Sequence, residues 1–186
     1  MTRLDCTIAE TELRIEQKTK PYEKLIAQLD AVPGIDLVTA IDLLAEIGTD
    51  MSAWKTHRQI AAMAGVCPGN YISAGKRLKN RSRQGNPYLK TALVQAACSA
   101  INVKGSYYQA KYVRLKQRRG HKRAIVAIAH TLLVTVYYML KRGEAYRELG
   151  SHLFAKEEKG RKKISLVKQL EKLGYAVTLH ETQLTA

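Results

Sequence analysis

The segment Cys67–Leu89, with the sequence CPGNYISAGKRLKNRSRQGNPYL, places one serine hydroxyl beside a dense set of cations. The serine is Ser73, at the start of a Ser-Ala-Gly turn sequence. The cations that follow it are Lys76, Arg77, Lys79, Arg81 and Arg83. A Gly-rich loop of cations that ends at a helix N-terminus is typical of a phosphate-binding site. A serine in such a loop is most often only a turn residue, so its type alone assigns it no chemistry.

The positive charge of the chain is concentrated in its middle. The 186 residues include 31 Lys and Arg against 16 Asp and Glu, a formal net charge of +15. Residues 51–143, which we call the carboxylate-free region, hold eighteen Lys or Arg and no Asp or Glu. A folded region of this kind repels itself unless a polyanion or an acidic neighbour is bound, and nucleic acid is the polyanion we expect. The alternative is a generally basic, solvated surface like that of a ribosomal protein, and the confined charge favours binding over it.

Further cations of this region stand on predicted helices. Lys90 follows Asn86-Pro87, a capping residue and a first-turn proline that together begin a helix. Four others, Arg118, Arg119, Lys122 and Arg123, flank Gly120 at the junction of two helices. We predict that these side chains, with the cations of the loop, contact nucleic-acid phosphates.

The segment Leu25–Gly48 reads as two helices joined by a tight turn, Val32-Pro33-Gly34-Ile35. This pattern resembles the helix-hairpin-helix element, which grips a DNA backbone. Gly34 would permit the turn, and the amides at the N-terminus of the second helix would meet a phosphate. A plain helical hairpin is the alternative, because Asp36 would cap that helix and its charge would oppose a phosphate there.

Helical periodicity dominates the remainder of the chain, so we expect a mainly α fold. The expected architecture is a helical bundle with a helix-hairpin-helix element, a basic Gly-rich loop or hairpin, and an N-terminal helical arm. We divide the chain into a helical arm or linker (residues 1–30), a domain that contains the helix-hairpin-helix element and the Ser73 loop (residues 31–150), and a basic helical tail (residues 151–186).

Local signals give four finer expectations. Pro21 should break the first helix, because proline lacks the N–H that a helix interior needs. Ser52 should cap a short helix that runs through Ala64. Residues 65–87 should form a loop or irregular hairpin, since they are rich in Gly, Pro, Asn and Ser. Ala176–Leu179 reads as a small strand.

The cysteines and the apolar segments indicate a protein of a reducing cytoplasm. Cys6, Cys67 and Cys98 are widely separated and lack a CxxC spacing, which argues against a disulfide framework or a zinc site. The first ten residues are polar and charged, unlike a secretory leader. Ala124–Leu140 has no charge, but it is shorter than the roughly 20 apolar residues of a spanning helix. We therefore expect a buried helix and no membrane contact.

Two histidines invite a role as general base, and we assign neither one. His130 lies within the apolar segment and is predicted to be a hydrogen-bonded core residue. His121 follows Arg119-Gly120 at a helix start, where contact with solvent or phosphate is expected. Neither has metal-ligand spacing to another His or Cys, so no metal site is predicted within the chain.

Three motifs, taken together, resemble one protein family. They are VPGI…LLAEIG, then AGVCPGNYISAGKR…RSRQGNPYLKTALVQAA, then RRGHKRAIVAIAHTLLV. They are similar to the C-terminal transposase domain of the insertion-sequence one-hundred-and-ten family, whose members are guided by a bridge RNA. The resemblance extends from about Leu25 to Tyr175, and Ser73 falls at the position of the family's nucleophilic serine.

The resemblance implies a composite active site. A RuvC-like domain with four acidic metal ligands would bind Mg²⁺, and the C-terminal domain would supply the serine, so that DNA is cut and rejoined through a serine–DNA bond. This sequence departs from the family because it contains no RuvC-like domain. Metal-assisted chemistry needs oxygen ligands such as carboxylates. We therefore expect no cofactor within this chain, activity only with a RuvC-like domain in cis or in trans, and DNA, bridge RNA and a second copy of the chain as partners.

Two other interpretations stay open. The chain would act as a non-catalytic nucleic-acid-binding fragment or transposition regulator if the acidic domain never joins it. It would act as a helical scaffold for an acidic protein if the cations of the loop contribute little to nucleic-acid affinity.

Overall fold

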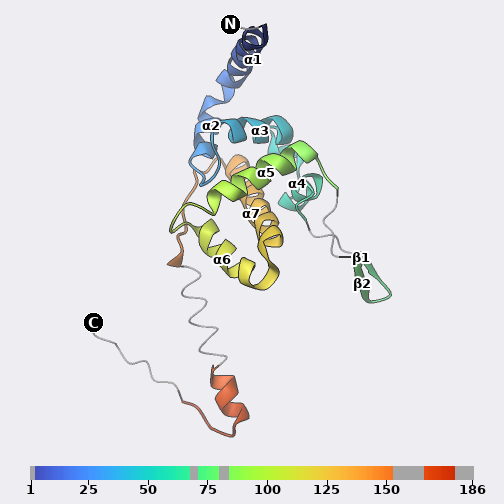
Figure 1. Ribbon diagram of the computed structural model, residues 1–186, viewed down its shortest axis with the longest axis vertical. Coiled ribbons are helices and arrows are strands. Elements are labelled where there is room, and N and C mark those ends of the chain that lie inside the picture. The colour runs from blue at the N-terminus through green and yellow to red at the C-terminus, as the bar shows by residue number, and fades with distance from the viewer. Residues whose placement is uncertain (1–2, 68–70, 80–83, 153–165, 179–186) are drawn as a thin grey trace, which may run out of the picture.

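The computed structural model of the chain describes residues 3–67, 71–79, 84–152 and 166–178 (Figure 1). Its helices are α1 (Arg3–Thr19), α2 (Glu23–Asp30), α3 (Leu37–Ile47), α4 (His57–Met63), α5 (Pro87–Ala100), α6 (Tyr107–Arg119) and α7 (His121–Arg142). Two 3₁₀ turns, η1 (Lys20–Tyr22) and η2 (Met51–Ala53), and two short strands, β1 (Tyr71–Ser73) and β2 (Lys76–Lys79), are also present, and residues 166–172 form a further helix without a label. The predicted mainly α fold is confirmed.

The central helix of the bundle is α7, and α4, α5 and α6 pack around it (Figure 1). Its buried side chains recur every three or four positions, as a helix with one buried side requires. They are Ala124, Ile125, Ile128, Ala129, Leu132, Leu133, Val136, Tyr137 and Met139. Most buried positions of α5 are alanines, which let neighbouring backbones come close. The core of the bundle is therefore formed by the apolar side of α7 and by α5, whose buried side chains are mostly small.

The length and apolar composition of α7 are those of a membrane-spanning helix and equally those of a helix in a protein core. It is the one helix in the described ranges that is long and apolar enough to cross a membrane, with a mean hydropathy of 1.6 over its most apolar stretch. Half of that stretch is buried inside the bundle. The prediction of a buried bundle helix agrees with this packing.

The N-terminal helix α1 stands away from the bundle (Figure 1). None of its residues is buried, although Leu4, Ile8 and Ile15 are apolar. Pro21 occupies the first turn of η1, so the chain breaks between α1 and α2 where the proline predicts a break.

The turn between α2 and α3 is pressed against α5. Gly34 has a φ of 86°, and a Cβ there would lie 2.4 Å from both the carbonyl oxygen of Ala96 and the backbone nitrogen of Ala100. Only glycine tolerates this conformation and this approach. The two helices and their tight turn are present as the sequence predicts, and Gly34 fixes how closely they approach α5.

Two of the finer expectations are wrong in detail. Ser52 lies within η2 and caps no longer helix, because Asp50 caps that turn by accepting a hydrogen bond from the Ser52 N–H (2.8 Å). The following helix α4 begins only at His57, after Thr56. Residues 176–178 form no strand, and Leu179 lies outside the described residues.

Candidate nucleic-acid interface

Ser73 lies at the tip of a β-hairpin, which we call the Ser73 hairpin (Tyr71–Lys79). Strands β1 and β2 are antiparallel, and Ser73 pairs with Lys76 across the turn. The two turn residues both have positive φ, 48° at Ala74 and 75° at Gly75, as in the mirror-image turns that close two-residue hairpins. The prediction of a loop or irregular hairpin is thus resolved in favour of a hairpin, and Ser73 is the last residue before its turn.

Three of the five predicted loop cations belong to the strand that pairs with the strand of Ser73. They are Lys76, Arg77 and Lys79, all in β2. Arg81 and Arg83 lie outside the described residues. The backbone therefore brings the serine and three cation-bearing positions into one small sheet, which Figure 1 shows beside the bundle, near α4 and the start of α5.

The long loop that carries the Ser73 hairpin is closed at its base. The backbone N–H of Asn86 donates to the carbonyl oxygen of Met63 (2.7 Å), which joins the chain after the hairpin to the end of α4 before it. A Cβ on Gly85 would lie 2.3 Å from the backbone nitrogen of Gly65 and from the Met63 oxygen. A glycine at position 85 is required for this close approach, and it sets where the loop returns to the bundle.

The side chain of Asn86 connects the base of this loop to two further elements, α5 and α3. Its side-chain oxygen caps α5 by accepting from the N–H groups of Tyr88 (2.9 Å) and Leu89 (3.2 Å). Its side-chain nitrogen donates to the half-buried carboxylate of Glu46 on α3. The Gly-Asn-Pro sequence thus anchors the loop to α3, α4 and α5 at once. Sequence reasoning predicted the cap but missed Glu46, because 40 positions separate it from Asn86 and no local pattern joins them.

The remaining predicted cations stand at three helix ends, the start of α5, the end of α6 and the start of α7. Lys90 is half-buried in the first turn of α5, while Arg118, Arg119, Lys122 and Arg123 are exposed on either side of Gly120. The arginines at the end of α6 face the negative end of that helix's dipole, which stabilises them. Lys122 and Arg123 stand instead in the first turn of α7, at the positive end, with no acid in that turn. An external anion would relieve this repulsion.

His121 begins α7 at the same junction. Its Nδ1 atom and the Tyr112 hydroxyl are 2.8 Å apart, and the Nζ of Lys116 lies 5.7 Å from the centre of the Tyr112 ring. The Tyr112 hydroxyl on α6 therefore holds the His121 ring in place. The ring is also exposed, so the expected contact with solvent or phosphate is sterically possible.

The N-terminus of α3, where a phosphate contact is predicted, already holds an anion. The Asp36 carboxylate accepts a hydrogen bond from the N–H of Thr39 (2.8 Å). Hydrogen bonds from the side chain and the backbone of Thr39 hold the pKa of Asp36 below its usual value. The structure thus gives Gly34 a packing role against α5, and its contact with a DNA phosphate stays a prediction.

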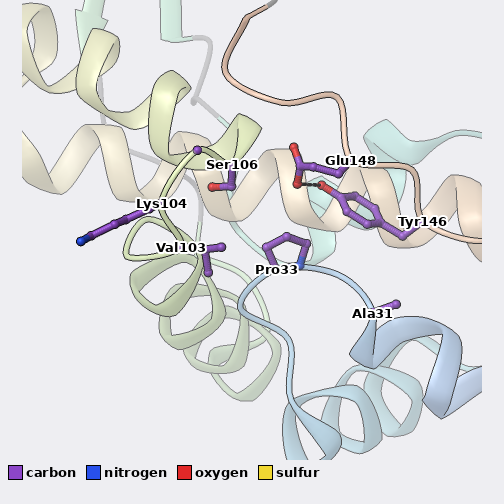
Figure 2. A pocket seen from close by; sticks show the side chains of 8 residues that line it. Ala31, Pro33, Val103, Lys104, Ser106, Tyr146 and Glu148 are labelled. Carbon is purple, nitrogen blue, oxygen red and sulfur yellow. Dashed lines mark hydrogen bonds between the residues drawn. The ribbon is translucent and has the colours of Figure 1, made fainter.

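A cavity of about 330 Å³ opens beside the same turn, between Pro33, the α5–α6 connection and Tyr146 (Figure 2). The Glu148 carboxylate accepts from the Tyr146 hydroxyl (2.7 Å), and the Lys104 side chain points away from it. Partial burial would raise the pKa of Glu148, but hydrogen bonds from Tyr107, Tyr146 and Gly150 outweigh it and the pKa is lowered. An ionised carboxylate on its wall makes this cavity a poor site for a phosphate.

Metal ligands are scarce in the described ranges. Within them, no group of three or more His, Cys, Asp or Glu side chains lies close enough together to hold a metal ion. The residues there do not fit a Mg²⁺ site, so no chemical step in this chain is derived through a metal.

Comparison with known proteins gives a consistent result. Residues 26–113 match the family described as "Transposase IS116/IS110/IS902 family". The chain is 31% identical over 124 residues to the transposase for insertion sequence element IS1111A of Coxiella burnetii, an alignment that covers 64% of this chain and 34% of that protein. It is 30% identical over 148 residues to a probable family 20 transposase of Pseudomonas aeruginosa, covering 77% and 43% of the two chains.

A third relative has a less specific description. It is an uncharacterized 42 kDa protein of the insertion element IS900 from Mycobacterium paratuberculosis, 26% identical over 147 residues, which are 77% of this chain and 36% of that protein. The chain thus spans between about one third and two fifths of the length of these curated relatives.

Proposed function

Since this chain belongs to the transposase IS116/IS110/IS902 family, we propose that it acts in DNA transposition as a nucleic-acid-binding part that supplies the nucleophile Ser73. The observation that carries the proposal is the Ser73 hairpin. Ser73 ends β1, and the paired strand β2 contains three cations within a region that has no carboxylate. The hairpin thus contains a nucleophile and cations, which are two of the parts that attack on a phosphodiester needs.

The proposed step is a phosphoryl transfer to serine. The Ser73 oxygen forms a bond to the scissile phosphorus, the bond from phosphorus to the leaving sugar oxygen breaks, the serine proton passes to a base and the leaving oxygen takes up a proton. Negative charge grows on the phosphoryl oxygens, and the cations at Lys76 and Arg77 would stabilise it. Strand rejoining reverses these bonds with a second DNA end.

The base and the acidic, metal-binding site are assigned in this proposal to another domain, in cis or in trans. The curated relatives are much longer than the part that this chain matches, so such proteins have room for a further domain. DNA, a guide RNA and a second copy of the chain are the proposed partners.

The test is covalent capture of DNA. The chain is combined with an acidic RuvC-like domain of a relative, guide RNA, Mg²⁺ and labelled target DNA, and adducts that survive denaturation are counted. The wild-type chain should form an adduct and Ser73→Ala should not. Ser99→Ala, an exposed serine on α5, is the matched control and should retain the adduct. An adduct that persists in Ser73→Ala removes Ser73 from the mechanism.

A non-catalytic role is the second candidate. It is favoured by the charge of residues 51–143, where eighteen Lys or Arg can bind nucleic acid whether or not Ser73 reacts. In that case the chain binds nucleic acid as a regulator and cuts nothing. Mg²⁺-dependent cleavage by the purified chain alone would contradict this candidate.

A further inference from the structure

One side of α7 is left open by the helices that pack around it. His130, Val134, Tyr138 and Lys141 follow each other at spacings of four, four and three, so they share one face of the helix. His130 and Val134 are half-buried, and Tyr138 and Lys141 are exposed. This open face runs between α6 on one side and α4 on the other.

From α6, Lys111 reaches across to α7. Its Nζ donates to the Thr131 hydroxyl (2.8 Å) and lies 5.3 Å from the centre of the Tyr107 ring. These contacts hold the ammonium group beside His130 without supplying any negative charge. A cation over an aromatic ring is attracted by the negative face of the ring and keeps its full charge.

Lys141 is held in the same way, eleven positions after His130 on the same face of α7. Its Nζ donates to the Tyr137 hydroxyl (2.9 Å) and lies 5.2 Å from the centre of that ring. Tyr137 is 2% exposed, and its hydroxyl donates to the carbonyl oxygen of Trp54 (3.1 Å), so the ring is rigidly placed. Hydroxyl groups and tyrosine rings therefore position both lysines, a role that carboxylates often have in proteins.

From α4, His57 completes the set. Its Nδ1 lies 3.3 Å from the Tyr138 hydroxyl, and its ring centre lies 5.7 Å from that of Tyr138. Burial lowers the pKa of His130, and the positive charges of His57 and Lys111 lower it further. Three helices thus bring basic groups together at His130, and the groups from α4 and α6 both disfavour a positive charge on His130.

Two carboxylates border this face, Glu144 three positions after Lys141 and Glu148, which accepts from the backbone N–H of Tyr107 (2.9 Å), but neither belongs to the face itself. His57, Lys111, His130 and Lys141 all belong to the carboxylate-free region. At the end of α7, Arg142 lies 3.9 Å from Glu144, but both side chains are more than half exposed, and such a surface pair contributes little. The mutual repulsion on the open face is the electrostatic condition that a bound polyanion relieves.

We propose that His57, Lys111, His130 and Lys141, which we call the α7 basic face, form a second nucleic-acid-binding surface that grips the backbone of a duplex. The inference rests on the proposed nucleic-acid-binding function, but it does not depend on Ser73 or on the cations of its hairpin. Thr131 to Lys141 spans ten positions, about 15 Å of helix, which is about four base pairs of a duplex.

A duplex fits this face better than an unpaired strand does. Proteins that bind single strands present open aromatic rings on which bases stack. Here the rings of Tyr107, Tyr137 and Tyr138 already carry Lys111, Lys141 and Arg142, with the Arg142 guanidinium 4.9 Å from the Tyr138 ring centre. The face thus offers charge and hydrogen-bond donors rather than stacking platforms, and it should read no base sequence.

The experiment compares two double variants of equal charge. Lys111→Gln with Lys141→Gln removes two cations of the α7 basic face, and Lys20→Gln with Lys24→Gln removes two exposed cations from η1 and α2. The dissociation constant for a 20-base-pair DNA duplex is measured from about 50 to about 200 mM salt. The first variant should flatten the slope of log affinity against log salt by about two units and weaken binding on the order of tenfold or more. The second should behave as wild type.

Further measurements distinguish a loss of binding from a loss of folding, and a duplex ligand from a single strand. Lys111→Arg with Lys141→Arg retains both charges and should retain duplex affinity, and thermal unfolding verifies that each variant folds. A single strand of the same length should lose less affinity than the duplex when Lys111 and Lys141 are replaced by Gln. A greater loss on the single strand overturns the assignment to a duplex.

The failure of this inference differs from that of the proposed function. If wild type binds the duplex and the Gln variant of the α7 basic face matches its charge control, the α7 basic face is not a binding surface and the proposed function stands. If wild type shows no salt-dependent binding of the duplex, both are overturned.

Discussion

The backbone N–H of Asn86 donates to the carbonyl oxygen of Met63 at 2.7 Å, which brings together the two ends of the loop that carries Ser73. A loop with joined ends loses less freedom when it binds, because part of its ordering is already complete. Gly85 and Glu46 secure the same junction from two other sides. The loop that contains the hairpin of the proposed nucleophile therefore has both its ends fixed on the bundle.

The first prediction concerns Gly85. Its replacement by Ala puts a Cβ 2.3 Å from the Gly65 nitrogen and the Met63 oxygen, so backbone must shift. We expect Gly85→Ala to lower the free energy of unfolding by about 1–3 kcal/mol. Urea denaturation measures it, with exposed Gln84→Ala as the control. Equal stability of the two variants would show that the junction is not tightly packed.

The second prediction concerns Gly34. Gly34→Ala and Gly48→Ala both place alanine at positive φ, 86° and 79°, but only the first meets backbone atoms, at 2.4 Å, while the second meets nothing within 4 Å. Gly34→Ala should therefore cost about 1–3 kcal/mol more of unfolding free energy than Gly48→Ala, as denaturant titration would report. Similar losses in the two variants would mean that α5 yields easily to the turn.

The third prediction concerns the pH dependence of stability. The pKa of His130 is lowered from 6.5 by burial and then by His57 and Lys111, so the unfolded chain binds more protons at this site than the folded one. Its contribution is fully present above pH 6.5 and is lost as pH falls below that value. Denaturation between pH 8 and pH 5 should show this decline, and His130→Gln should reduce it. His152→Gln, at an exposed histidine, should leave the decline unchanged; a decline of equal size in His130→Gln would contradict the assignment.

The fourth prediction concerns the loop cations. Lys79 belongs to β2, and Arg83 follows it in sequence. If each touches one phosphate, Lys79→Ala and Arg83→Ala should each flatten the salt slope of DNA binding by about one unit. Lys18→Ala on exposed α1 is the control and should leave the slope unchanged. Wild-type slopes in both loop variants would support the scaffold interpretation instead.

Local sequence signals predicted the features that depend on neighbouring residues. The Asn86 cap with Pro87 in the first turn and the break at Pro21 both follow from residues a few positions apart. Ser52 shows the limit, because a competing local partner, Asp50, caps the turn instead.

Features that depend on distant residues could not be predicted. The Glu46–Asn86 contact spans 40 positions and the His57–Tyr138 contact spans 81, and the α7 basic face exists only once three helices pack. His130 was predicted to be a core residue, since it lies in an apolar segment. It is half-buried, because it lies on the open face of α7 and not on the side that carries buried residues such as Ile128 and Leu132.

The most direct test of the account is the salt dependence of DNA binding by the wild-type chain. The dissociation constant for duplex DNA is measured across a series of salt concentrations, and log affinity is plotted against log salt. For about 6 phosphate contacts the slope should lie near −5. A slope near zero would contradict the claim that the carboxylate-free region binds nucleic acid through its cations.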